Sequence, residues 1–178
     1  MKVTALPTVR PAYQRLLVPA IFGFLGYTAV MVRLDAELRN TGGPGIIAFE
    51  LAGTADRAER MMELWGSQGR LLAHRSMRLD FGYILSYGFL LALVLDRARR
   101  PLAHRPTAMW AAAIAVAGDA VEGVSLLRVL RGSDVERNAG RARDAAIIKF
   151  AALAVGLGYA ALGAVTSRRH RRGLEGAT

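Results

Sequence analysis

The chain has 178 residues, of which 53% are hydrophobic, and a formal net charge of +10 at pH 7. This length predicts one compact unit rather than two domains. The absence of cysteine excludes a disulfide framework and thiolate chemistry. The arginines flank apolar blocks and form no patch interleaved with aromatic residues, so we expect them to bind anionic lipid head groups and not nucleic acid.

Four apolar blocks separate the charged segments and predict helices that cross a membrane. They cover about 16–32, 79–95, 108–127 and 145–165. The first block lacks a small-residue cleavage site, so we interpret it as a retained span and not as a signal peptide. The sequence therefore predicts an all-α, four-helix transmembrane bundle formed by the single domain 1–178, with a basic tail at 166–178.

The connection between the first two spans contains a helical pattern at about 46–65. Its apolar residues gather on one side, and its uninterrupted apolar part is too short to cross a membrane. We expect an amphipathic helix there that lies on the membrane surface or caps the bundle. Gly66-Ser67-Gln68-Gly69 should end this helix, and Trp65 should anchor it at the lipid–water interface.

Four spans place both termini and the loop 96–107 on one side of the membrane. This short loop holds Arg97, Arg99, Arg100 and Arg105, and short basic loops usually stay in the cytoplasm. The preference for arginine over lysine, together with abundant alanine and glycine, is typical of a GC-rich bacterial genome. We therefore expect a multi-pass protein of the bacterial inner (cytoplasmic) membrane with cytoplasmic N- and C-termini.

Ionisable residues interrupt the third and fourth predicted spans. Asp119 and Glu122 lie in the third, and Lys149 lies in the fourth. Each charge near the membrane centre costs on the order of 3 kcal/mol, so we expect these side chains to face inward and Lys149 to pair with Asp119 or Glu122. The predicted topology places all three in the outer half of the bilayer. We interpret Asp119, Glu122 and Lys149 as candidate catalytic residues, although Lys149 has a second interpretation as a side chain that reaches the interface.

The second span carries polar residues on one helical face. Asp80, Tyr83 and Tyr87 share this face, and Arg75 or Arg78 is close enough in sequence to reach Asp80. With Glu50, we interpret Asp80, Tyr83, Tyr87 and Arg78 as candidate ligand-binding residues. Other interpretations remain open: Asp80 as a helix N-terminal acid, the tyrosines as an interfacial belt, and Glu50 as a solvated acid.

No pattern in the chain predicts a cofactor or a metal site. His74, His104 and His170 all lie outside the predicted spans, which argues against haem and against a His-based metal site. The acids at 50, 80, 119 and 122 have the oxygen ligands that Mg²⁺ prefers, but Lys149 among them argues against a bound cation. Walker, His-Glu-x-x-His and Gly-x-Ser-x-Gly motifs are absent from the sequence.

The order of short motifs resembles a family of bacterial four-span membrane proteins. The matching pieces are Phe49-Glu50-Leu51, Trp65-Gly66, Leu79-Asp80-Phe81 with Tyr87, Gly118-Asp119 with Glu122, and Lys149. In that family the acid of the third span is followed by asparagine, whereas Gly123 takes that place here. The resemblance implies that the ionisable cluster is a shared feature, and it implies no particular activity.

These observations favour a pocket that binds or processes a lipid-like or other amphiphilic small molecule. Tyr83 and Tyr87 would line the pocket, Lys149 would hold an anionic head group, and Asp119 with Glu122 would position or transfer protons. The alternative is an accessory or assembly subunit, in which a seam of small residues in the fourth span docks on a membrane partner or on a second copy. The seam consists of Ala152, Gly156, Ala160 and Ala164. Proton-coupled transport is a third possibility, with less support because no inverted repeat or broken helix is visible.

Overall fold

The protein is an elongated bundle of helices. The computed structural model describes residues 12–175, with side chains from 15 to 167, and this part contains helices but no strand. The elements are α1 (Ala12–Arg39), α2 (Ile46–Glu50), α3 (Ala55–Arg99), the 3₁₀ helix η1 (Pro106–Met109), α4 (Trp110–Leu130) and α5 (Val135–Glu175). The predicted all-α class is confirmed.

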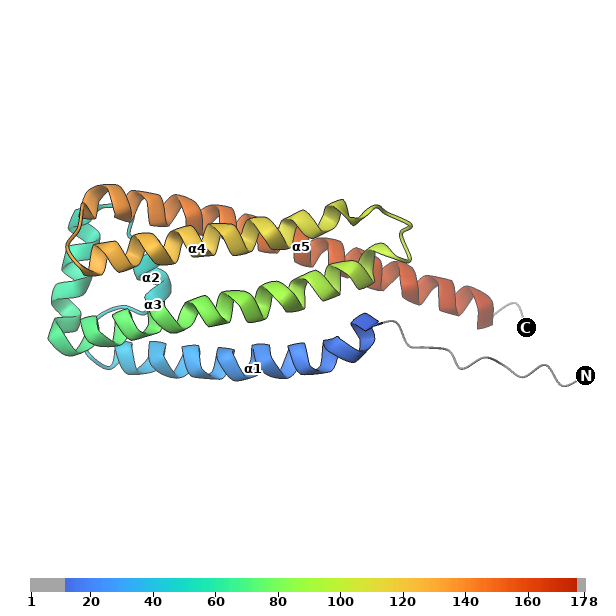
Figure 1. The fold of residues 1–178 in the computed structure, drawn as a ribbon, viewed down its shortest axis with the longest axis horizontal. Coiled ribbons are helices and arrows are strands. Elements are labelled where there is room, and N and C mark those ends of the chain that lie inside the picture. Colours follow the sequence, from blue (N-terminus) through green and yellow to red (C-terminus); the bar gives the residue numbers. More distant parts are fainter. Residues whose placement is uncertain (1–11, 176–178) are drawn as a thin grey trace, which may run out of the picture.

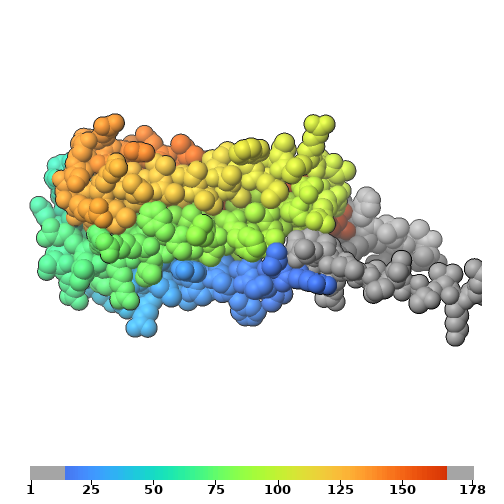
Figure 2. Space-filling model, in the orientation of Figure 1, coloured from blue at the N-terminus to red at the C-terminus, as the bar shows by residue number. Residues whose placement is uncertain are grey.

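Four long rods lie side by side, and successive rods run in opposite directions (Figure 1). They are α1, the longer part of α3, α4 and α5, whereas α2 and the start of α3 lie at one end of the bundle. The face drawn in Figure 2 shows α1, α3 and α4 closed against one another along most of this length. We refer to the end that holds α2 as the α2 end.

Three of the described helices are long and apolar enough to cross a membrane. They cover Arg15–Arg39, Ala55–Arg99 and Val135–Ser167, and they contain three of the four predicted spans. The 21-residue α4 is not among the three, although it lies parallel to them.

Large apolar side chains cover the outside of the bundle. Phe22 of α1 is 71% exposed, Leu85 of α3 is 69% exposed, and Val155 of α5 is 68% exposed. Between residues 21 and 33 of α1 no residue is buried. Apolar surface spread over several helices in this way is expected for contact with lipid, whereas a monomer in water seldom exposes so much of it.

The predicted single helix at 46–65 is wrong. The chain leaves α2 after Glu50, passes through Gly53 at φ +74°, and starts α3 at Ala55. Thr54 caps the new helix, because its Oγ1 accepts a hydrogen bond from the Arg57 N–H over 3.4 Å. A left-handed glycine followed by a capping threonine favours a helix start over continuation, and this local signal outweighs the apolar periodicity.

The prediction of Trp65 as an interfacial anchor is also wrong. Its side chain is only 2% exposed, and its ring packs against Phe49 with 4.9 Å between centroids. Its Nε1–H donates to the Pro44 carbonyl oxygen over 2.8 Å. Trp65 thus fills a core at the α2 end that is built from α1, α2, α3, α4 and α5. The other large members of this core include Leu38, Met62, Met77, Leu126 and Val129.

Gly66 bends α3 and does not end it. Its backbone has φ +61° and ψ −163°, a conformation that is almost restricted to glycine, and helical structure continues on both sides. The predicted end at Gly66–Gly69 is therefore a sharp change of direction within one element. This bend lets the first turns of α3 cross the α2 end of the bundle before the helix turns along its axis (Figure 1).

We expect Gly66→Ala to destabilise the protein by about 1–3 kcal/mol, because alanine is strained at this backbone conformation. Gly158→Ala is the matched control, since Gly158 is exposed on α5 with no neighbouring atom within 4 Å of an added Cβ. It should be neutral or stabilising by up to about 1 kcal/mol. Unfolding of both variants in detergent, followed by circular dichroism, measures the difference, and equal stability would contradict the bend.

Candidate functional site

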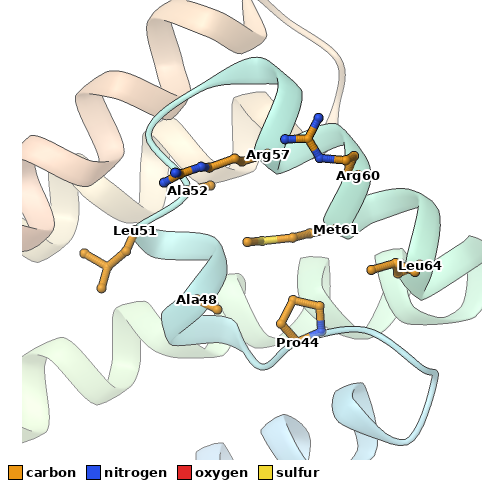
Figure 3. A pocket seen from close by; sticks show the side chains of 8 residues that line it. All are labelled: Pro44, Ala48, Leu51, Ala52, Arg57, Arg60, Met61 and Leu64. Carbon is orange, nitrogen blue, oxygen red and sulfur yellow. The ribbon is translucent and has the colours of Figure 1, made fainter.

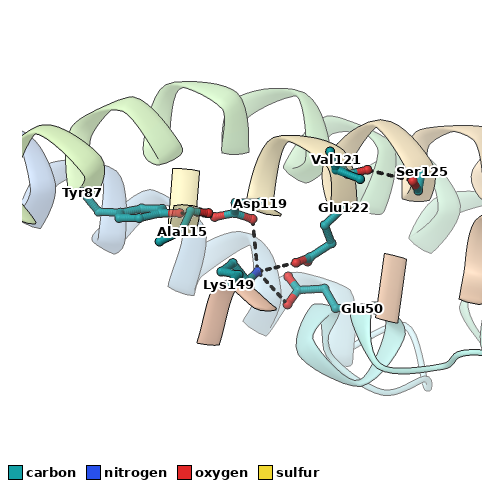
Figure 4. Close-up of polar contacts among 8 residues, drawn as sticks. All are labelled: Glu50, Tyr87, Ala115, Asp119, Val121, Glu122, Ser125 and Lys149. Atoms are coloured by element: carbon teal, nitrogen blue, oxygen red, sulfur yellow. Dashed lines mark hydrogen bonds and ion pairs between the residues drawn. The ribbon is translucent and has the colours of Figure 1, made fainter. Parts of the chain in front are cut away.

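Lys149 forms the centre of a buried cluster of charges (Figure 4). Its Nζ lies 2.7 Å from Glu122 Oε2, 3.1 Å from Asp119 Oδ1 and 3.3 Å from Glu50 Oε2. The four residues are between 2% and 7% exposed. The structure thus brings the three candidate catalytic residues together, and it adds Glu50, which is not a solvated acid.

Three elements supply the charge cluster of Glu50, Asp119, Glu122 and Lys149. Asp119 and Glu122 are one turn apart on α4, Lys149 is on α5, and Glu50 is the last residue of α2. Gly118 lets α4 and α5 approach closely, because a Cβ at this position would lie 3.2 Å from the Ala145 carbonyl oxygen and 3.3 Å from the Lys149 nitrogen. This close approach brings the carboxylates of α4 within reach of the lysine.

Tyr87 extends the cluster toward α1. Its hydroxyl donates to Asp119 Oδ2 over 2.8 Å, so both oxygens of Asp119 have partners. The Tyr87 ring meets Tyr83 edge-on with 5.6 Å between centroids, and Tyr83 stacks on Phe24 of α1 at 5.8 Å. The predicted interfacial belt does not describe Tyr87, which is buried and hydrogen bonded to an acid.

Three carboxylates surround one ammonium group in the charge cluster. The Lys149 ammonium donates hydrogen bonds to Asp119 Oδ1 and Glu50 Oε2, whereas its contact with Glu122 Oε2 is an ion pair without a hydrogen bond. With all groups ionised the cluster has a formal charge of −2. Burial raises the pKa of the Glu50 carboxyl above its usual range, and the attraction of Lys149 offsets this only in part. The arrangement can therefore share a proton among its acids.

A cavity of about 670 Å³ lies beside the charge cluster. Its walls come mainly from α1, α3 and α5, because α1 packs chiefly on α3 and leaves a space toward α5. Along α3 the lining changes from Asp80 through Tyr83 and Tyr87 to Leu90 and Val94. Along α5 it changes in the same direction, from Lys149 to Leu153 and Leu157. The cavity is polar near the α2 end and apolar farther along the bundle.

Six of the eight residues that we expected at a site line this cavity: Glu50, Asp80, Tyr83, Tyr87, Asp119 and Lys149. Glu122 belongs to the charge cluster but is not part of the lining. Arg78 is exposed and lies outside the lining, and no ion pair of the described residues joins Arg75 or Arg78 to Asp80.

Sequence reasoning missed two charged residues of the lining. Asp35 and Arg39 of α1 form an ion pair with 2.6 Å between Oδ2 and Nη2. The other Asp35 oxygen accepts the N–H of Ile46 over 2.7 Å and so holds the start of α2. The sequence contained a signal for this ion pair, because an acid and a base four residues apart at the end of the first apolar block lie next to each other on a helix.

A second hollow lies at the α2 end, between α2 and the first turns of α3 (Figure 3). Its volume is about 440 Å³, and its cationic lining residues are the exposed Arg57 and Arg60. Arg60 already pairs with Asp56 over 2.6 Å. No buried polar group lines this hollow, so the cavity beside the charge cluster is the better candidate site.

Comparisons with family models, with curated proteins and with solved structures found no match for this chain.

We expect Lys149→Met to lower the free energy of unfolding by about 3–5 kcal/mol, because it leaves buried carboxylates without their cation. Tyr87→Phe should lower it by about 1–3 kcal/mol, the contribution of one hydrogen bond to a charged group. Arg141→Met, at an exposed position of the same α5, is the control and should stay within about 0.5 kcal/mol of the wild type. Denaturant titration in detergent ranks the three variants; a Lys149→Met protein as stable as the control would show that the cluster contributes nothing to folding.

Proposed function

We propose that this protein is a membrane-embedded bundle that binds an amphiphilic small molecule in the cavity between α1, α3 and α5. The observation that carries the proposal is the gradient of the lining, from ionisable residues near α2 to leucine and valine farther along the bundle. A volume of about 670 Å³ lies within the range of about 300–1,000 Å³ that is common for ligand pockets. An amphiphile fits such a cavity with its head group among the acids and its chain along α3 and α5.

The membrane part of the proposal includes four crossings. Supporting it, α4 lies parallel to three helices that are apolar and long enough to span, so it occupies the same slab of lipid (Figure 1). The start of α1 and the end of α5 lie at the end of the bundle opposite α2, as does the basic loop 96–107. Because short basic loops usually stay in the cytoplasm, this arrangement favours cytoplasmic termini in a bacterial inner membrane. The α2 end and the charge cluster then belong to the outer half of the protein.

Binding of an amphiphile requires no proton transfer. If the bound molecule also reacts, the positions of Asp119 and Glu122 indicate which of them is the better placed acid or base. Asp119 lines the cavity and shares hydrogen bonds with both Tyr87 and Lys149. Glu122 reaches Lys149 from outside the lining. We therefore assign a catalytic acid or base role to Asp119 before Glu122 if the bound molecule is also processed.

The accessory-subunit alternative gains no support from the seam of small residues on α5. Ala152 and Gly156 are buried within the bundle. A Cβ at Gly156 would lie 3.5 Å from Leu91 and 3.6 Å from Ala111. This part of the seam serves contacts of α5 with α3 and α4, so it is not a free surface for a partner.

Filling the cavity should prevent binding. We expect Val94→Trp to reduce retention of a single-chain amphiphile by at least about tenfold, because the indole occupies the apolar part of the lining. Leu85→Trp, on the lipid-facing side of the same α3, is the control and should leave retention unchanged. Native mass spectrometry of protein released from lipid nanodiscs measures retention, and equal effects of the two tryptophans would contradict the site.

The natural lack of cysteine allows a test of the crossings. Ser67→Cys directly follows the Gly66 bend of α3 at the α2 end, and Thr107→Cys lies in η1, between α3 and α4 at the opposite end. Both positions are exposed. In intact bacterial cells a membrane-impermeant maleimide should label Ser67→Cys alone, and Thr107→Cys should react only after permeabilisation. Labelling of both variants in intact cells would contradict the proposed topology.

A further inference from the structure

We infer that the occupant of this cavity is a long-chain amine, an apolar chain that ends in a protonated amino group. The inference rests on the proposed function and specifies the charge of the head group. It replaces the expectation that Lys149 holds an anionic head group. The charges of the described residues that line the cavity, and the partners that these residues already have, favour a cationic head group.

Acids outnumber bases at the polar end of the cavity. The lining contains the acids Asp35, Glu50, Asp80 and Asp119 and the bases Arg39 and Lys149. Glu122 contacts Lys149 from outside the lining. When Glu122 is counted with the lining residues, five acids and two bases give a formal charge of −3. A single proton shared within the charge cluster leaves −2. A cationic head group would lower this excess, and an anionic one would increase it.

The two cations near the cavity are already paired. Lys149 has carboxylates within 3.3 Å on three sides, so a ligand's anion would have to displace one of them. Arg39 holds Asp35 and has a side chain that is 62% exposed. Neither cation is therefore a free binding group inside the cavity.

Asp80 is the acid that has no partner of its own. Among the described residues no hydrogen bond or ion pair of its side chain is found, although it lines the cavity and is only partly exposed. The nearby pairs use the carboxylates of Asp35, Glu50 and Asp119, which leaves Asp80 to receive an ammonium group. An ammonium group has donors for several acceptors at once, so it can reach Asp80 and a neighbouring carboxylate together.

The shape of the lining favours a single long chain. Val94 follows Asp80 by 14 positions along α3, which correspond to roughly 21 Å at 1.5 Å per residue. Leucines of α5 face the same space at Leu153 and Leu157. A chain extended along these walls places its amino end at Asp80 and its apolar end beside Val94.

The test uses three probes with the same chain length and different head groups: dodecylamine, dodecanol and dodecanoate. The full-length protein in phosphatidylcholine nanodiscs at pH 7 is mixed with each probe, and native mass spectrometry measures the bound fraction. Empty nanodiscs correct for partition into lipid. We expect dodecylamine to bind at least about tenfold more tightly than dodecanoate, with dodecanol between them.

Asp80→Asn is the decisive variant because it removes the charge without changing the size of the side chain. It should weaken dodecylamine binding by at least about tenfold and leave dodecanol binding unchanged. Asp144→Asn is the matched control, an exposed aspartate on α5 near the same end of the bundle, and should change neither probe.

Dodecanoate bound as tightly as dodecylamine, or an Asp80→Asn protein with undiminished amine binding, would overturn the inference about the head group. In that case binding that Val94→Trp abolishes would still support the proposed function. Failure of the wild type to bind any of the three probes would overturn the proposed function, and the inference with it.

Discussion

The contact of Lys149 with three carboxylates is the constraint on which the arrangement of this protein depends. It joins a residue of α5 to two acids of α4 and one of α2, all of them nearly inaccessible. Such a contact adds little net stability compared with a well-packed apolar core, because each charge has to leave water. It is costly to break, however, since one missing partner leaves a buried charge alone. The cluster therefore fixes the relative positions of three elements.

α1 contributes no residue to the charge cluster and is held in a different way. It packs on α3. Its Asp35 pairs with Arg39 of the same helix and accepts a hydrogen bond from the N–H of Ile46, the first residue of α2. A space remains between α1 and α5, and the charge cluster lies at one end of that space. Burial of the acids and the presence of an amphipathic cavity thus have one structural origin. The change from a polar to an apolar lining follows from the order of residues along α3 and α5.

The amino-acid sequence contains most of the helical layout and much of the site. Strong apolar blocks identify the long helices, and the cost of a buried charge predicts that Asp119 and Glu122 meet Lys149. The break between Glu50 and Thr54 was missed because the apolar periodicity of 46–65 continues through it. Trp65 could not be placed from the sequence, because a tryptophan at a helix end fits an interface and a core equally well. Asp35 and Arg39 were missed because they lie where the first apolar block ends, and their approach to α2 depends on how the chain turns back.

The composition offers a direct measurement of the charge cluster. Only two of the 24 lysine and arginine residues are lysines, Lys2 and Lys149, so ¹⁵N-lysine labelling gives two ammonium signals. Combined with ¹³C-labelled aspartate and glutamate in lipid vesicles, solid-state dipolar recoupling measures the distances from each lysine nitrogen to nearby carboxyl carbons. One ammonium signal should show short couplings to both aspartate and glutamate carboxyls and slow proton exchange with water. Two signals that exchange rapidly and couple to no carboxyl carbon would contradict the buried cluster.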